Sequence, residues 1–211
     1  MTGHRPTDEM LADFAFGAAL PGTALLVAAH LTHSPESRAR VAALEGIGGA
    51  FLEDEAPADM APGALDAVLA KIDMPAEIAP TEPVDQGPLP LPVIDALGMG
   101  FTDIPWKFRL PGGAEYELDG YGDQKVSLLR ARAGAKVPQH THEGLEMTLI
   151  LQGALQDGGT VYRKGDVSIN DEDDDHRPQA VGDETCYCLI VQQGGLKFTG
   201  TFSRILNYLG E

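Results

Sequence analysis

The stretch that decides the fold is Gly134-Ala-Lys-Val-Pro-Gln-His140-Thr-His142-Glu-Gly-Leu-Glu146-Met-Thr-Leu-Ile-Leu-Gln-Gly153. Side chains two residues apart on a strand point to the same face, so His140 and His142 present their imidazoles side by side. Glu146 lies at an even offset that can return a carboxylate to them, and we expect all three to come from one hairpin. His176 supplies a fourth donor, which a later strand would bring opposite the first three.

The sequence around this stretch alternates short apolar runs with turn residues. The runs are separated by Gly, Asp or Pro, as in an all-β sandwich or barrel. They predict an antiparallel barrel of roughly 115 residues. The expected strands are 106–110, 115–118, 125–132, 145–151, 160–162, 166–169 and 185–191. We expect Phe101, Trp106 and Phe108 to lie in the barrel core.

The spacing G-x5-H-x-H-x3-E-x6-G resembles the first motif of the cupin family. Gly165 and His176 resemble the second motif, although its usual Pro-x-Gly is replaced around Asp171 and Glu172. The resemblance implies a jelly-roll β-barrel of six to eight strands, with one divalent metal ion held by the four side chains His140, His142, Glu146 and His176.

Three nitrogen donors and one oxygen donor suit Zn first, because Zn prefers a tetrahedral set. Fe, Mn or Ni would complete an octahedron with water and leave positions open to substrate or O2. The alternative is a cupin that has lost its metal, in which hydrogen bonds satisfy the same polar side chains.

Residues 1–75, which we call the helical module, show helical patterns. Thr7 and Ser34 are predicted N-caps, and Pro35 occupies the first position of its helix. Four short helices are expected, with apolar faces at Leu11/Phe14, Leu25–Ala29, Val41/Leu44/Ile47/Phe51 and Leu65/Val68/Leu69/Ile72. Such a unit buries only a thin core, so we expect it to depend on a metal, a partner or a second copy of itself.

A proline-rich segment divides the chain. Six prolines fall between Pro75 and Pro92, which predicts a semi-extended linker over residues 76–92. The expected organisation is therefore multi-domain, α followed by all-β: the helical module at 1–75, the linker at 76–92 and the cupin barrel at 93–211.

The composition excludes several classes of partner. The formal charge is −17, so the chain is repelled by nucleic acid and by anionic membrane surfaces. No secretory signal or spanning segment is evident, and we expect a cytoplasmic protein. Cys186 and Cys188 alternate along one strand, where an unstrained disulfide does not form, and reduced, buried thiols are expected. The acidic run 171–175 is expected to be a solvated loop.

Nearly the whole chain resembles the ChrR-type cupin anti-sigma factors. The resemblance includes residues 7–11 with Gly17, the stretch 30–32, residues 38–40, the cupin ligands and the strand at 186–188. It implies a cytoplasmic repressor whose helical module binds an extracytoplasmic-function sigma factor. It also implies that the metal-binding cupin triggers release in response to singlet oxygen or organic hydroperoxide.

One departure from that family concerns a second metal. The family's helical module binds zinc through an amino-terminal His and an H-x3-C-x2-C cluster. Here His30 occupies the His position of the cluster, but Ser34 and Ser37 replace its two cysteines. Serine is a poor zinc ligand, so the site is absent or rebuilt from His4, His30 and His33. The simpler reading is that Ser34 is a helix cap.

The alternative function is a metal-dependent cupin enzyme, a dioxygenase or related, acting on a small molecule. The helical part would then be an oligomerisation arm, and a homo-oligomer is left open by the sequence. Tyr121, Tyr162 and Gln152 are candidates for acid–base work if they face the interior of the barrel.

Overall fold

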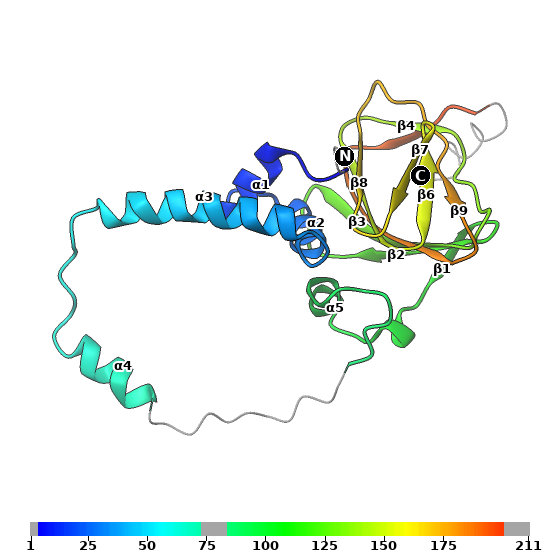
Figure 1. The fold of residues 1–211 in the computed structure, drawn as a ribbon. Helices are drawn as coiled ribbons and strands as arrows, with labels where there is room; N and C mark the ends of the chain where they lie inside the picture. Colours follow the sequence, from blue (N-terminus) through cyan, green and yellow to red (C-terminus); the bar gives the residue numbers. More distant parts are fainter. Residues whose placement is uncertain (1–3, 73–83, 201–211) are drawn as a thin grey trace.

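Helices come first and strands second along the chain (Figure 1). The computed structural model describes residues 4–72 and 84–200. The helices are α1 (Asp8–Ala15), α2 (Pro21–Leu31), α3 (Pro35–Glu53), α4 (Ala64–Ile72), α5 (Leu91–Leu97) and a 3-10 turn at Phe101–Asp103. The strands are β1 (Lys107–Leu110), β2 (Gly113–Leu118), β3 (Gln124–Ala131), β4 (His140–His142), β5 (Glu146–Gln152), β6 (Ala154–Asp157), β7 (Thr160–Arg163), β8 (Val167–Asn170), β9 (Gln179–Val181), β10 (Cys186–Gln193) and β11 (Leu196–Phe198).

The strands form three sheets, and every pairing between them is antiparallel. The largest has the order β1-β2-β3-β10-β5-β8, and the smaller ones are β11-β4 and β7-β6-β9. This arrangement confirms the predicted fold class, a helical region followed by an antiparallel cupin-like β-structure. Each of the seven strands expected from the sequence is present, and four short ones join them.

The central strands of the large sheet are buried on both faces. On one face, Ile150, Cys186 and Cys188 pack with Leu129 and Leu155 inside the β-structure. On the other face, apolar side chains of β3, β5 and β10 pack against helices α2 and α5; these side chains are Val126, Leu128, Met147, Leu149, Leu151, Leu189 and Val191. The run of buried residues along β5 reflects this double coverage.

Helix α2 belongs to that core. Leu25, Leu26 and Ala29 lie in the same apolar cluster as Val126 and Val191 of the sheet. The helix approaches so closely at Gly22 that an added Cβ would lie 2.7 Å from a methyl carbon of Val126. The helical module is therefore packed onto the cupin along α2 rather than connected to it by the chain alone.

The predicted helix starts are confirmed. The Thr7 side chain accepts a hydrogen bond from the Met10 amide, and the Ser34 side chain accepts one from the Ser37 amide. Helix α3 is not short, since it runs for 19 residues. Only its first half is packed, through Val41, which meets Leu11 and Val27 in a small core. Ile47 and Phe51, predicted on the same face as Val41, are exposed.

The structure differs from the sequence prediction in the linker and in the aromatic core. Residues 76–83 of the linker lie outside the described residues, and α5 begins at Leu91, within the predicted linker range. The prediction for Phe108 is wrong, because its side chain is 76% exposed on the first strand of the large sheet. Trp106 and Phe101 are half-buried, and their rings pack against Tyr187.

Candidate metal centre

Two strands and one bridge residue carry the four predicted ligands. His140 and His142 lie on β4, and both are buried on its inward face, with Thr141 between them. Glu146 is the first residue of β5. The expectation of a single hairpin is wrong: β4 pairs with β11, whereas β5 pairs with β10 and β8. The chain turns between two sheets at residues 143–145, and this brings the carboxylate back to the imidazoles.

His176 is fixed by its own backbone. Its amide donates to the His140 carbonyl (3.0 Å), and the His140 amide donates to the His176 carbonyl (3.1 Å). This isolated antiparallel bridge lies 34 residues beyond His142, and it places the His176 ring beside the other two. The prediction that a later segment brings His176 opposite the first three ligands is confirmed.

The donor atoms of the four side chains converge. One ligand atom from each residue lies within 4.8 Å of all the others. His176 Nε2 is 2.9 Å from His142 Nε2 and 3.1 Å from His140 Nε2. Glu146 places its oxygens 3.6 Å from His142 Nε2 and 3.9 Å from His176 Nε2.

Outer partners orient two of the rings. His140 Nδ1 donates to the Pro138 carbonyl (2.7 Å), and His176 Nδ1 donates to the Asp157 carboxylate (2.5 Å). With the proton held on Nδ1, the Nε2 lone pair of each ring points into the cluster. Lone pairs that face one another in a buried site repel, and a shared cation removes the repulsion. A proton-bearing nitrogen directed away from the donors is also the usual arrangement of metal-bound histidine.

Glu146 is held in the same way. Gln192 on β10 donates to one oxygen of the carboxylate (2.6 Å), and the Thr148 hydroxyl lies 3.5 Å from the other. The Glu146 side chain is 7% exposed and has no Lys or Arg partner among the described residues. A buried carboxylate without a cationic side chain costs free energy unless another positive charge is present. The surroundings of Glu146 therefore fit a bound metal ion.

The pKa shifts favour free lone pairs on His140 and His142, whereas those of Glu146 and His176 favour the protonated form. Burial, together with the neighbouring His140 and His176 rings, lowers the pKa of His142 to about 4. Burial lowers the pKa of His140 as well, and it raises the pKa of Glu146. Burial opposes the charged form of His176 too, but Asp157, Glu146 and Asp174 outweigh it and raise the pKa of that ring. Neutral imidazole is the form that binds metal, so His140 and His142 are ready to bind at pH 7.

The sequence reasoning missed Asp157 and Gln192. Asp157 ends β6, 19 residues before His176, and Gln192 lies on β10, 46 residues after Glu146. Neither belongs to a motif. An Asp followed by two glycines is too common a pattern to have identified a partner of His176.

The second metal site considered from the sequence, in the helical module, lacks converging donor atoms among the described residues. The side chains of His4, His30 and His33 form no converging donor group in residues 4–72 and 84–200; the cluster of His140 is the one found there. The His4 ring packs against the Tyr162 ring at a tilt of 58°, with centroids 4.6 Å apart. His30 is hydrogen-bonded through both ring nitrogens, to Gly165 and to Ser37. The predicted cap role of Ser34 is confirmed.

The acid–base candidates do not approach the cluster. Tyr162 contacts His4, and Tyr121 packs against the apolar core between sheet and helices, where burial raises its pKa. Gln152 pairs with Tyr187 at the far end of β5 from Glu146. In the described part of the chain, no hydrogen bond joins any of the three to the four donors.

The predictions for the two cysteines and for the acidic run are confirmed. Cys186 and Cys188 are free, fully buried thiols with Sγ atoms 3.6 Å apart. The hydrogen bond shared with Cys186 and burial raise the pKa of Cys188, so the thiol form dominates. Residues 171–175 are an exposed loop. None of the helices in residues 4–72 and 84–97 combines the length and hydrophobicity that crossing a bilayer requires.

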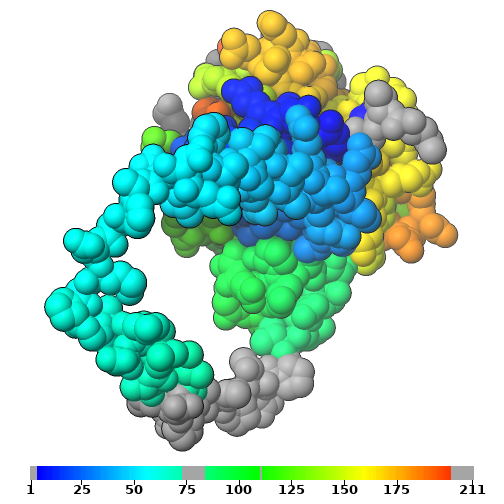
Figure 2. Space-filling model, turned by 60° about the vertical axis from the view of Figure 1, so that its left-hand side comes forward, coloured from blue at the N-terminus to red at the C-terminus, as the bar shows by residue number. Residues whose placement is uncertain are grey.

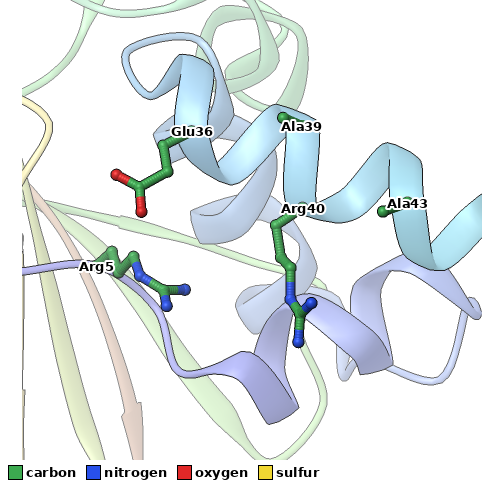
Figure 3. Close-up of a pocket in the computed structure, with 5 residues that line it drawn as sticks. All are labelled: Arg5, Glu36, Ala39, Arg40 and Ala43. Atoms are coloured by element: carbon green, nitrogen blue, oxygen red, sulfur yellow. The ribbon is translucent and has the colours of Figure 1, made fainter.

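A pocket lies away from this cluster, on the helical module (Figure 3). Its volume is about 320 Å³, and Arg5, Glu36, Ala39, Arg40 and Ala43 line it. The Arg5 guanidinium binds the Asp8 carboxylate at 2.9 Å, and Arg40 lies 3.7 Å from the same group. The pocket shares no residue with the candidate metal centre.

Comparison with known proteins gives concordant results. The family model of the ChrR cupin-like domain matches residues 97–196. The chain is 33% identical over 205 residues to the anti-sigma-E factor ChrR of Cereibacter sphaeroides, with 96% of this chain and 95% of that protein covered.

One solved structure is similar across most of the chain. The crystal structure of Rhodobacter sphaeroides SigE in complex with the anti-sigma ChrR matches with a TM-score of 0.77 and 33% identity, covering 90% of this chain and 98% of that one. An RmlC-like cupin protein from Ralstonia eutropha matches at 22% identity and a TM-score of 0.42, over 51% of this chain and 83% of its own.

Proposed function

The chain belongs to the ChrR family of cupin anti-sigma factors, and on that premise we propose that it binds and represses an extracytoplasmic-function sigma factor through its helical module, residues 1–75. The observation that carries the proposal is the similarity to ChrR across the helical and β-rich regions together. The proposed activity requires the chain to meet the sigma factor in the cytoplasm.

An uncovered apolar surface supports the proposal. On α4, the side chains of Leu65, Val68, Leu69 and Ile72 lie on one stripe and are 49–72% exposed. At the end of α3, Ile47, Phe51 and Leu52 are also exposed. Both segments extend away from the β-structure (Figures 1 and 2). Apolar surface of this extent is typical of a protein-binding site.

Charge supports the same kind of partner. The chain carries 32 acidic against 15 basic side chains. A sigma factor binds DNA and polymerase, so it presents basic surface that an acidic repressor can approach faster and cover. The same charge disfavours direct contact with nucleic acid.

We also propose that His140, His142, Glu146 and His176 hold one divalent metal ion, Zn first and Fe, Mn or Ni next. A metal bound there would supply a Lewis acid inside the barrel. Around it, Asp157 and Pro138 hold the ring protons, and Gln192 holds the carboxylate. The cupin would control release of the sigma factor in response to singlet oxygen or organic hydroperoxide.

The binding proposal is tested with the full chain and the sigma factor it captures. The V68E/L69E variant places two carboxylates on the apolar stripe of α4, and we expect its affinity for the sigma factor to fall about 100-fold or more. The A67E/A70E variant adds the same two charges on the opposite side of α4 and is expected to bind like the native chain. Equal affinity of the two variants would contradict the proposed surface.

The release proposal has a separate test. A complex made with the H140A/E146A variant should form normally but stay intact when tert-butyl hydroperoxide dissociates the native complex. Loss of sigma binding in this variant would contradict a purely regulatory cupin. Metal-dependent turnover of a small carbonyl compound, with no sigma factor captured, would favour the enzyme instead.

A further inference from the structure

His30, Ser34 and Ser37 are joined by a continuous series of hydrogen bonds at the start of α3. Both His30 and Ser37 are buried, with 2% and 0% exposure. We infer that this network replaces the zinc site of the family's helical module, and that it fastens the module to the cupin at Gly165. The inference concerns how the module is held, and it stands whether or not the chain binds a sigma factor.

Each polar atom of the network has a defined role. His30 Nδ1 donates to the Gly165 carbonyl (2.8 Å), which leaves Nε2 as an acceptor. The Ser37 hydroxyl donates to Nε2 (2.8 Å) and accepts from the Ser34 hydroxyl (2.9 Å). Ser34 Oγ in turn accepts from the Ser37 amide (3.1 Å). The lone pair of the imidazole is therefore used, and none is left for a metal ion.

The donor set does not fit zinc. A structural zinc ion in a protein is held by thiolate, imidazole or carboxylate, and two neutral hydroxyls supply none of these. Burial lowers the pKa of His30, so the ring stays neutral, as the network requires. The H-x3-S-x2-S spacing is kept, but the three residues now bind one another.

The network also reaches across to the cupin. Gly165 lies two residues before β8, and next to it the Val167 amide donates to the His4 carbonyl (2.8 Å). Gly165 has a φ of +90°, and an added Cβ would lie 3.0 Å from the Cβ of His33. A glycine is therefore needed at this contact.

The strand that follows leads to the candidate metal centre. At the other end of β8, Asn170 pairs with Glu146, one of the four donors. The module is thus attached to the strand that lies directly beside a metal ligand. Zinc chelators and thiol oxidants have no target in the module, so a signal of that kind has to act elsewhere in the chain.

The test uses hydrogen exchange in the full chain carrying H140A/H142A, so that the cupin cannot load metal. We expect a zinc chelator to leave exchange in residues 21–53 unchanged, and zinc titration to show no stoichiometric binding. Chelator-induced exchange in residues 21–53, or one equivalent of zinc that is lost on adding H30A, would overturn the inference.

A second set of variants tests the contact with the cupin in the native background. H30A should speed exchange in residues 21–44 and 165–170 together, by about tenfold, because a buried hydrogen-bonded group loses its partners. S37A, a smaller change, should speed exchange in residues 35–44 and spare residues 165–170. H4A keeps its backbone carbonyl and serves as the control with little effect. If H30A speeds exchange only in α3 and leaves residues 165–170 unchanged, the inferred attachment of the module to the cupin is overturned.

Discussion

Two histidine clusters in this chain differ in what their ring nitrogens face. In the cupin, His140 and His176 bind outer groups through Nδ1, and their Nε2 atoms converge with that of His142. In the helical module, His30 uses Nδ1 for Gly165 and Nε2 for a hydroxyl. Both sites are buried, so burial does not distinguish them.

The comparison shows how a metal site differs from a polar network. A metal site presents several lone pairs to one point and satisfies the other nitrogen of each ring from outside. A polar network alternates donors and acceptors until none is left over. His30 follows the second pattern, whereas His140 and His176 follow the first. His142 shares their converging Nε2, but its buried Nδ1 has no hydrogen-bond partner among the described residues. All four resemble metal ligands by position in the sequence.

The largest expected effect is on metal affinity, which a mutation in the cupin cluster should reduce and a mutation in the helical module should not. H142A should weaken metal binding by about 100-fold or more, because four donors share a binding free energy of about 10–16 kcal/mol at a zinc site. H30A should leave the affinity within about twofold. Competition with a chromophoric chelator measures both, and a strong loss in H30A would mean that the two clusters are one system.

Metal removal should destabilise the cupin. At free metal about a thousand times above Kd, binding adds about 4 kcal/mol to the free energy of unfolding, and chelation should remove it. Thermal unfolding with and without EDTA measures the change as a fall in Tm. The H142A variant is the control: with its affinity reduced about 100-fold, the same free metal adds only about 1.4 kcal/mol, so EDTA should lower its Tm much less.

Replacing Asp157 should reduce the metal affinity measurably, but by less than replacing one of the four ligands. D157N keeps the size of the side chain and removes the charge that holds the His176 proton. We expect metal affinity to fall about 10–100-fold, as for other outer partners of metal-bound histidine. D183N, at an exposed carboxylate, is the matched control. Equal affinities of the two variants would show that His176 needs no carboxylate to be oriented.

The smallest expected effect is the pH response of His30. Burial lowers its pKa in the folded chain, so between that value and the ordinary 6.5 the unfolded state binds more protons. The contribution is fully present above pH 6.5 and is lost as pH falls below it, by at most about 1.4 kcal/mol per pH unit. Denaturant unfolding of the native chain and of H30Q over pH 5–7.5 measures the difference, and parallel curves would contradict it.

Much of the fold could be predicted because local rules agreed with the packing. Thr7 and Ser34 cap helices as their types favour, and the strands of the β-region follow the alternation of the sequence. The prediction that Phe108 is buried was wrong because an apolar residue on the first strand of the sheet need not face the core. Helix α5 was missed because Pro90 and Pro92, at its start, also fit an extended linker.

The candidate site was predicted where a motif fixed the spacing, and missed where it did not. His140, His142 and Glu146 lie close together in the sequence, and His176 is the next histidine along the chain. Asp157, Gln192 and Gly165 reach their partners only through sheet register and the packing of α2, which local sequence does not specify. The burial of β5 on both faces could not be predicted for the same reason.

The most direct test of the central claim is an anomalous difference map from crystals of the full chain, collected at the absorption edge of the metal found by elemental analysis. The account predicts one peak, among the Nε2 atoms of His140, His142 and His176 and the Glu146 carboxylate, and no density between His30 and Ser37. A peak at Ser37, or none among the cupin side chains of a metal-replete sample, would contradict it.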